Sequence, residues 1–300
     1  MATTEDRSEE RLPQHTQPSS VLLILPLTLL VVAFFLAPIA IFVAYSFLTA
    51  GLFKVLLPFT FEAYRAALGS NLNLALAANS VAIGAMTSVV SVALGLAIAY
   101  WLRYRAGQWQ LPVLFLMIAS MLASYLVRIY AWRTILGANG VINRSLLELG
   151  LIDEPLRFLL FNWFSVVLAL VHIFLPYVVL VLYAALRPLN PAYLEVAEDL
   201  GATAVMRWRR VILPLMAAPV ISAFLFVFVL SASDYITPQL IGGTGGQMLG
   251  VQIQASFKAI GNWPLGAATS LLMLLGFVVC YLALQAGLRV TGLDRIRWAS

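Results

Sequence analysis

Few side chains in this sequence could carry out covalent or metal chemistry. Cys280 is the only cysteine, so no disulfide can form within the chain and no cysteine metal site is possible. The two histidines, His15 and His172, lie far apart in the sequence and are too few for a zinc site. The sequence contains neither an H-E-x-x-H nor a G-x-S-x-G motif. We therefore expect no catalytic residue, no metal site and no cofactor on this chain.

Polar side chains inside long apolar runs are a second group that could act chemically, because ionisable residues in membrane spans are functional candidates by default. The candidates for a translocation path are Arg128, Tyr130, Trp132 and Asp234. If the helices that carry them are continuous, Arg128 lies about 26 Å from the inner end of its span, and Asp234 lies about 30 Å from the inner end of its own span. Asp234 then lines the outer mouth of a path or pairs with Arg128, and Arg128 can alternatively extend to lipid headgroups. His172, near mid-membrane, is expected to be a hydrogen-bonded packing residue.

The chain has one strongly charged insert, residues 187–213, between two apolar runs. Asn190 is a good N-cap, so a helix is predicted from there to about Leu200. Gly201 supplies the residue that most readily turns a helix end, and a second helix is expected from about Ala204.

On the first of these helices, Leu194, Ala197 and Leu200 fall on one apolar face that is predicted to be open to a partner. The flanks carry Glu195, Glu198 and Asp199. One interpretation is an amphipathic helix that lies on the lipid surface, but such helices usually carry Lys or Arg on their polar face. An acidic helix fits a basic protein groove better.

The composition shows what these elements are embedded in. The chain is 62% hydrophobic and 10% charged, whereas a soluble domain is about 25% charged. Runs of about 20 apolar residues predict membrane-spanning helices, and an all-α, six-span membrane protein over residues 19–300 follows. The predicted spans are Ser20–Leu48, Leu74–Leu102, Leu111–Leu136, Phe161–Leu186, Leu213–Thr237 and Trp263–Leu288. Residues 1–18 are polar and are predicted to be a disordered cytoplasmic tail.

Lys and Arg gather on one side of these spans. Eleven lie on the side of the amino terminus and five on the other, which predicts that both termini and the charged insert are cytoplasmic. Of the external segments, 136–150 is expected to be a turn and a brief helix capped by Asn143 and ended by Gly150. The glycine-rich segment 241–250 is expected to be a flexible or tightly turning loop, because it lacks the G-K-[ST] ending of a phosphate-binding loop.

The insert contains the spacing E-x-A-x-x-x-G and, after nine further residues, an aliphatic residue followed by x-L-P. This spacing resembles the EAA signature of binding-protein-dependent ABC importer permeases. Val196 stands where a second alanine is usual, and Val211 replaces isoleucine. The segments 128–143 (RIYAWRTILGANGVIN) and 233–243 (SDYITPQLIGG) are similar to the spermidine/putrescine-type subfamily. The matching signature residues are Glu195, Ala197, Gly201, Val211, Leu213 and Pro214.

The resemblance implies a function that the residues alone do not. The insert would be the coupling helix that docks on a separate ATP-hydrolysing subunit, which binds ATP and Mg²⁺. A periplasmic binding protein would deliver a small solute, such as a polyamine, to a path in the inner membrane shared with a second, different permease. The residues implied in ATPase coupling are Glu195, Ala197, Asp199, Gly201, Leu213 and Pro214.

The main alternative is a secondary transporter driven by an ion gradient. That class usually has an internal repeat and broken helices with ionisable groups near the midplane, and no clear repeat is present in this sequence. The substrate stays open, because Asp234 suits a cation whereas Arg128 and Arg133 suit an anion.

Overall fold

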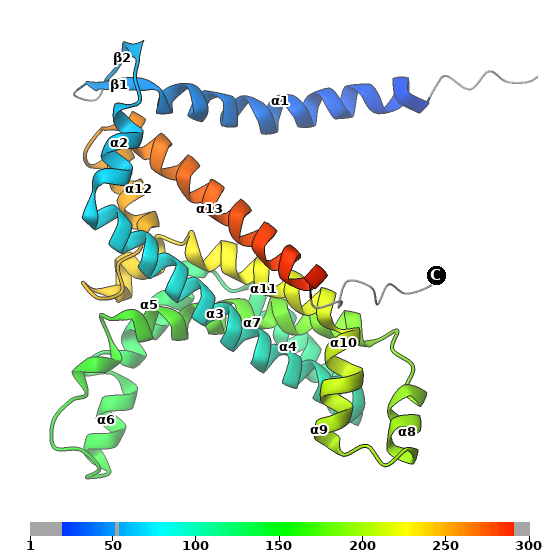
Figure 1. Cartoon of the computed structure of the whole chain (residues 1–300). Coiled ribbons are helices and arrows are strands. Elements are labelled where there is room, and N and C mark those ends of the chain that lie inside the picture. The colour runs from blue at the N-terminus through cyan, green and yellow to red at the C-terminus, as the bar shows by residue number, and fades with distance from the viewer. Residues whose placement is uncertain (1–19, 52–53, 291–300) are drawn as a thin grey trace, which may run out of the picture.

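A computed structural model describes residues 20–51 and 54–290 of the chain (Figure 1). The tail predicted for residues 1–18 lies outside the described residues. Apart from one small hairpin, the elements are helical. In chain order they are α1 (Ser20–Ser46), β1 (Leu48–Gly51), β2 (Lys54–Phe59), α2 (Glu62–Gly69), α3 (Asn71–Tyr104), η1 (Gly107–Trp109), α4 (Gln110–Leu122), α5 (Tyr125–Leu136), α6 (Val141–Glu148), η2 (Arg157–Leu159), α7 (Trp163–Leu186), α8 (Ala192–Asp199), α9 (Ala204–Arg207), η3 (Trp208–Ile212), α10 (Leu213–Leu215), α11 (Ala217–Ala232), η4 (Pro238–Gly242), α12 (Leu249–Lys258) and α13 (Trp263–Val290).

Four of these helices are long and apolar enough to cross a membrane, namely α1, α3, α7 and α13. Two further crossings result if each of two bent helix pairs counts as one span. The all-α, multi-span prediction is therefore confirmed. The sequence did not predict the antiparallel hairpin β1–β2, in which Gly51 pairs with Lys54.

The prediction that the third and fifth spans are continuous helices is wrong. The axes of the helices before and after Ala123 and Ser124 differ by 98°, because both residues adopt extended backbone angles. The fifth span bends by 72° at Met216. Pro219 has no N–H to donate to the carbonyl of Leu215, which weakens the helix at that point. The depths assigned to Arg128 and Asp234 from a straight helical rise therefore do not hold.

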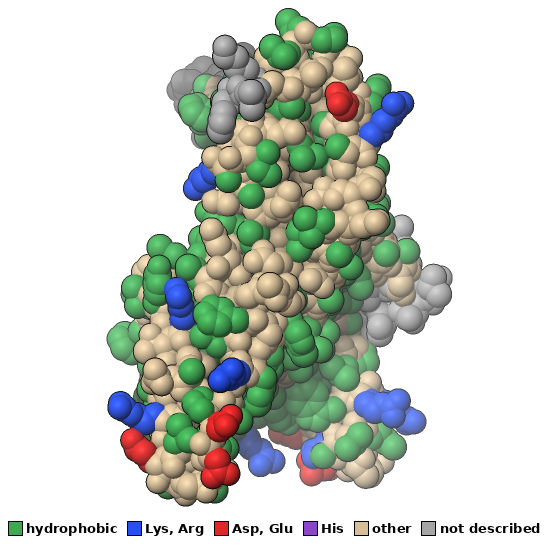
Figure 2. Space-filling model, turned by 90° about the vertical axis from the view of Figure 1, so that its left-hand side faces the viewer, with side chains coloured by type: hydrophobic (Ala, Val, Ile, Leu, Met, Phe, Trp, Pro, Cys, Tyr) green, Lys and Arg blue, Asp and Glu red, His purple; other side chains and the backbone are tan. Residues whose placement is uncertain are grey.

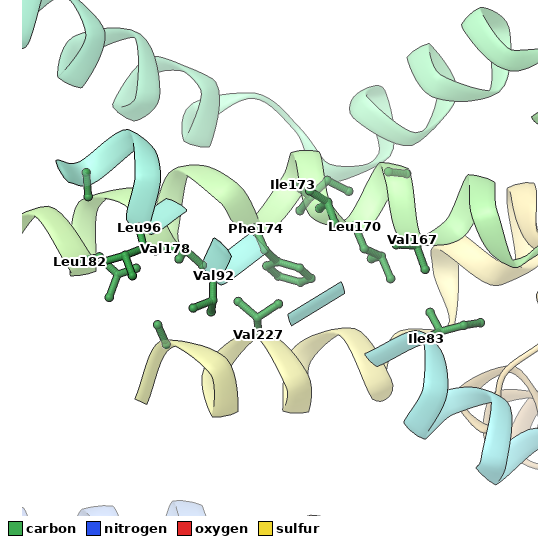
Figure 3. Packing of buried hydrophobic residues seen from close by; sticks show 14 of the residues in the cluster. Ile83, Val92, Leu96, Val167, Leu170, Ile173, Phe174, Val178, Leu182 and Val227 are labelled. Atoms are coloured by element: carbon green, nitrogen blue, oxygen red, sulfur yellow. The ribbon is translucent and has the colours of Figure 1, made fainter. Parts of the chain in front are cut away.

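The core of the chain lies where α3, α7 and α11 pack together. Val92 of α3, Phe174 of α7 and Val227 of α11 meet in it, with Leu96 and Leu170 beside them (Figure 3). Small residues allow the helix backbones to approach closely, as they commonly do in membrane proteins.

Two glycines of α3 occupy these close contacts. A β-carbon on Gly84 would lie 2.8 Å from the β-carbon of Ala232 on α11. A β-carbon on Gly95 would lie 2.5 Å from a methyl group of Val178 on α7. Both positions therefore require glycine for the observed packing.

The charged insert and the segments around α6 and the β1–β2 hairpin lie at opposite ends of the fold. In Figure 1, α8 and α9 project on the side to which α13 runs, while α6 and the β1–β2 hairpin lie on the other side. On the face shown in Figure 2, most charged side chains lie on the lower projections, and the middle of the face is mostly apolar or neutral.

Candidate functional site

The helix α8 begins close to where the sequence predicts. The side-chain oxygen of Asn190 accepts a hydrogen bond from the backbone N–H of Ala192 at 3.0 Å. Pro191 already has helical dihedral angles, although the regular helix starts one residue later. The side chain of Asn190 thus satisfies one of the free N–H groups of the first turn, as a capping residue does.

The end of α8 is a glycine-dependent reversal of the chain. Gly201 has a φ of +79°, a left-handed conformation that glycine adopts without steric cost. The N–H of Ala202 donates to the carbonyl of Ala197 at 2.9 Å, and the N–H of Gly201 donates to that of Glu198 at 2.8 Å. These two bonds form a Schellman motif, which ends the helix sharply. The role predicted for Gly201 in turning the chain is confirmed.

The next helix, α9, is held against α8. The N–H of Met206 donates to the hydroxyl of Thr203 at 3.4 Å, which caps the first turn of α9. Arg207 of α9 forms an ion pair and hydrogen bond with Glu198 of α8. The two short helices and the Gly201 turn therefore form one hairpin at the surface.

The exposed face of α8 differs from the predicted one. Leu194 is half-buried and packs against the membrane-helix core, so it is not available to a partner. The exposed apolar side chains are instead Tyr193, Val196 and Leu200, which are 50%, 56% and 82% exposed. Their spacing of three and four residues places them on one face of the helix. We call these three residues the outer face of α8.

Acidic side chains border this outer face. Glu195 and Asp199 are both exposed and lie one turn apart, whereas Ala197 is half-buried. The surface is therefore an apolar strip with carboxylates beside it. Such a surface suits a protein groove that is apolar at its centre and basic at its rim.

The last signature residues lie in the elbow between α9 and α11. Leu213 is 42% exposed and Pro214 is half-buried, and both belong to α10 just before the bend at Met216. The ring of Trp208 in η3 contacts that of Tyr100 on α3 at 4.8 Å, which fixes the elbow to the membrane helices. A movement of α8 and α9 would therefore be transmitted to α11 through a short, well-packed segment.

The four candidates for a translocation path do not form one cluster. Arg128 is buried, 8% exposed, and its guanidinium donates to the carbonyl of Ile173 on α7 at 3.4 Å. Trp132, one turn later, donates its indole N–H to Nδ1 of His172 at 3.1 Å. Tyr130 is 51% exposed and points away from these contacts. On α5, Arg128 and Trp132 therefore face α7, while Tyr130 faces outwards.

The carboxylate of Asp234 is occupied by three hydrogen bonds. It accepts from the N–H groups of Ile236 and Thr237, both at 3.1 Å, and from the hydroxyl of Tyr125 at 2.7 Å. The Tyr125 hydroxyl also lies 2.9 Å from that of Thr237. Asp234 thus caps the helical segment that leads into η4 and ties it to α5. Asp234 and Arg128 both lie among the described residues, and they form no ion pair with each other.

The segments around α6 contain a glycine turn and side-chain bonds between loops. Gly150 has a φ of +67° and follows α6, as predicted for the residue that ends this helix. The prediction that Asn143 caps α6 is wrong. Asn143 lies inside the helix, where it donates to the carbonyl of Gly137 at 2.9 Å and accepts from the N–H of Leu156 at 2.7 Å. It therefore holds two neighbouring loops together.

The described residues include no group of three or more His, Cys, Asp or Glu side chains that could hold a metal ion. The candidate site consists of two parts: the outer face of α8 at one end and the buried polar contacts of α5 near the other. An arrangement of this kind suits mechanical coupling between a partner and a set of membrane helices.

Comparison with known proteins decides which kind of membrane protein carries these surfaces. Residues 111–289 match the family described as the binding-protein-dependent transport system inner membrane component. The chain belongs to this family of transporter permeases. It is therefore the permease subunit of an ABC importer, and the matched region contains both surfaces.

Individual relatives of this permease agree with the family. It is 31% identical over 239 residues to the spermidine/putrescine transport system permease protein PotB of Haemophilus influenzae, covering 79% of this chain and 83% of that one. It is 33% identical over 193 residues to PotB of Escherichia coli, covering 64% and 70% of the two chains.

Solved structures confirm the fold of the permease. A chain of a bacterial ABC transporter involved in the import of the acidic polysaccharide alginate superposes with a TM-score of 0.72, 16% identity and coverage of 92% and 95%. A second structure of a bacterial alginate ABC transporter, in complex with a periplasmic protein bound to an alginate pentasaccharide, gives a TM-score of 0.72 and 15% identity.

The structure of the permease adds contact residues that the sequence interpretation missed. Tyr125 was not among the candidates for the translocation path, although it lies three residues before Arg128 and seven before Trp132, and hence on the same helical face. Thr237 completes the same contact. Tyr193 was missed because helical periodicity alone does not show which face of α8 the protein itself covers.

The capping geometry predicts how the permease responds to changes at Asp234. Asp234→Asn should keep most of the folded yield, because the one oxygen of asparagine can still accept from the N–H of Thr237 and the hydroxyl of Tyr125. Asp234→Ala should lose about 1–2 kcal/mol of stability, since the cap and the bond from Tyr125 both disappear. Thermal unfolding in detergent measures the difference between the two variants. A loss of yield in Asp234→Asn that Arg128→Gln restores would show instead that the two charges pair.

Proposed function

We propose that this permease forms part of a path through which a cationic polyamine crosses the inner membrane after delivery by a periplasmic binding protein. The observation that carries the proposal is the likeness, at 31% and 33% identity, to permeases named for spermidine and putrescine transport. The sequence segments 128–143 and 233–243 belong to the same resemblance, and they form the α5 and η4 contacts described above. The path itself is proposed to include the outward-facing Tyr130.

We also propose that the outer face of α8 docks on a separate ATP-binding subunit, which holds ATP and Mg²⁺. The support is geometric and electrostatic: Val196 and Leu200 are exposed apolar side chains at the tip of a projecting hairpin, and Glu195 and Asp199 border them. Exposed apolar anchors surrounded by polar groups are typical of protein interfaces. The elbow at Leu213 and Pro214 then transmits the movement to α11.

A second, different permease subunit is the remaining partner in the proposal. Along α1, every residue from 24 to 44 is exposed, and the helix extends away from the α3, α7 and α11 core (Figure 1). On the face shown in Figure 2, a recess lined by hydrophobic side chains separates two lower projections. Both features leave apolar surface available to another membrane subunit.

Reconstitution in proteoliposomes tests the proposed function. The chain is combined with its ATP-binding subunit, second permease and binding protein, and ATP-dependent uptake of radiolabelled spermidine or putrescine is measured. Unlabelled polyamine should compete, whereas an acidic oligosaccharide should not. Failure of every polyamine to bind the binding protein or to stimulate ATP hydrolysis would contradict a polyamine substrate.

The proposed orientation places the α8–α9 hairpin in the cytoplasm and α6 on the outside. In a variant that lacks Cys280, single cysteines at Ser145 and Gly245 should react with an impermeant thiol reagent in intact cells. A cysteine at Thr203 should react only after the cells are opened. All three positions are exposed, and a side chain at Gly245 meets open space. Labelling of position 203 in intact cells would reverse the orientation.

A further inference from the structure

His172 occupies an unusual position on α7. Between Ser165 and Leu180 of this fully described helix, it is the one residue in the exposed class. Its neighbours Val171 and Ile173 are buried in the core. Ionisable side chains within membrane helices generally face a partner helix or a water-filled cavity rather than lipid. The exposed imidazole is therefore expected to face another helix or a water-filled space rather than lipid.

Trp132 determines which hydrogen-bonding form of His172 fits. Its indole N–H, 3.1 Å from Nδ1 of His172, can only donate. Nδ1 must therefore accept, and the imidazole proton lies on Nε2. A doubly protonated imidazolium would place two N–H donors against each other at this contact. The rings meet edge to face, with centroids 5.6 Å apart, so the contact also fixes the orientation of His172.

The position of Trp132 is itself fixed by α5. One turn earlier, Arg128 donates to the carbonyl of Ile173, the residue that follows His172. One turn earlier again, Tyr125 is hydrogen-bonded to Asp234. Three successive turns of α5 are thus attached to α7 and to the segment before η4. Trp132 is held in place by these bonds as well as by its contact with His172.

We infer that His172 lines the solute path as a neutral side chain, and that Trp132 is the positioning residue that keeps it neutral. The inference rests on the proposed function, because a positive charge on His172 would repel a polyamine cation. Arg128 does not have this effect to the same degree, since it is 8% exposed and its guanidinium points into the α5–α7 contact.

The surroundings of His172 are compatible with control by Trp132. Arg128 is a charged side chain close to His172 in the fold, because its guanidinium donates to the carbonyl of the next residue, Ile173. The α4, α11 and η4 segments that pack on α7 contain no Asp, Glu, His, Lys, Arg, Tyr or Cys. The other titratable or charged side chains on the elements that pack on α7 are Tyr100, Arg103 and Tyr104 on α3, Tyr125, Tyr130 and Arg133 on α5, and Asp234 and Tyr235 before η4. On α7 itself they are Tyr177 and Tyr183.

The test is the pH profile of spermidine uptake by the complete transporter in proteoliposomes. The wild type should show no step attributable to His172 between about pH 5 and 8, the interval in which histidine ordinarily changes charge. Trp132→Phe keeps an aromatic ring but removes the N–H donor, so His172 becomes free to accept a second proton. Uptake by this variant should then fall by about tenfold for each pH unit below a midpoint in that interval.

The double variant Trp132→Phe with His172→Gln separates this explanation from a loss of structure. It has no imidazole, so its uptake should be independent of pH over the same interval, whatever its absolute rate. Size-exclusion chromatography checks that each variant assembles. A flat profile for Trp132→Phe, or a pH step that persists in the double variant, would overturn the inference.

Stimulation of ATP hydrolysis by the loaded binding protein is recorded on the same vesicles. If the wild type transports no polyamine, the proposed substrate is wrong. The pH dependence of stimulated ATP hydrolysis in the wild type, Trp132→Phe and the double variant then still tests the role of His172. A pH step in Trp132→Phe that His172→Gln removes supports its neutral role for another solute. The absence of a pH step in Trp132→Phe would overturn the role of His172. If the wild type nevertheless takes up polyamine, the proposed function still holds.

Discussion

Replacing Gly201 by valine is expected to remove most transport and most stimulated ATP hydrolysis while the membrane helices stay folded. At a φ of +79°, a residue with a β-carbon costs about 1–2 kcal/mol, and a β-branched residue is a genuine outlier there. The chain would relieve this strain by giving up the two Schellman bonds that end α8. Leu200, which immediately precedes the turn and is 82% exposed, would then lose its fixed position on the outer face.

Gly201→Asn is the matched control for this prediction. Asparagine is among the few side chains that visit the left-handed region readily. Among the described residues, no atom other than those of position 201 and its two sequence neighbours lies within 4 Å of a β-carbon there, so neither substitution clashes with the packing around the turn. The difference between the two variants therefore reports the backbone conformation of the turn. Because 1.4 kcal/mol corresponds to a factor of about ten, we expect valine to be about tenfold less active than asparagine.

Both activities are measured per assembled complex, so that a change in expression does not enter. ATP hydrolysis stimulated by the loaded binding protein reports coupling, and uptake reports the whole cycle. Equal activity of Gly201→Val and Gly201→Asn would mean that the left-handed turn is not needed for coupling. A loss of membrane insertion in the valine variant would place its effect in folding rather than in the proposed docking.

The local features of this coupling hairpin could be predicted because their signals lie within a few residues of each other. Asn190 before the helix and Gly201 after it define the ends of α8 through backbone hydrogen bonds that any helix of this sequence would need. The face that α8 presents could not be predicted in the same way. Leu194 and Leu200 are equally apolar, and only packing on the membrane helices covers Leu194 and leaves Leu200 exposed.

The break between α4 and α5 shows the same limit in the membrane region. Neither Ala123 nor Ser124 is a helix-breaking residue, so hydrophobicity predicts one continuous span from Leu111 to Leu136. The contacts that hold α5 at 98° to α4 come from distant parts of the chain. The bond from Tyr125 to Asp234 joins residues 109 positions apart, and that from Trp132 to His172 joins residues 40 apart. The hydrophobic periodicity of a single sequence contains no information on contacts between residues so far apart.

Replacing Gly84 by valine is the second change with a large expected effect, in this case on folding. A β-carbon at Gly84 would lie 2.8 Å from the β-carbon of Ala232 and 3.2 Å from both its Cα and its N. Because backbone atoms are among the contacts, rotating one side chain cannot relieve the overlap. The helices α3 and α11 would have to separate, and overpacking of this kind typically costs about 1–3 kcal/mol. We expect a lower yield of detergent-extracted protein and a lower unfolding temperature.

Gly276→Val on α13 is the matched control, because no described atom outside the helix's own nearby backbone lies within 4 Å of a β-carbon at that position. Replacing glycine by valine changes the intrinsic helix propensity by the same amount at both helix-interior positions, so this change cancels when the two variants are compared. The double variant Gly84→Val with Ala232→Gly lacks the methyl group of Ala232. It should recover only part of the lost yield and unfolding temperature, since the contacts with the backbone of residue 232 remain. Equal unfolding temperatures for Gly84→Val and Gly276→Val would show that α3 and α11 do not pack as closely as described. Close approach of these two helices matters for transport because α11 follows the elbow after α9, so the helix that receives any movement of the coupling hairpin lies directly against the core helix α3.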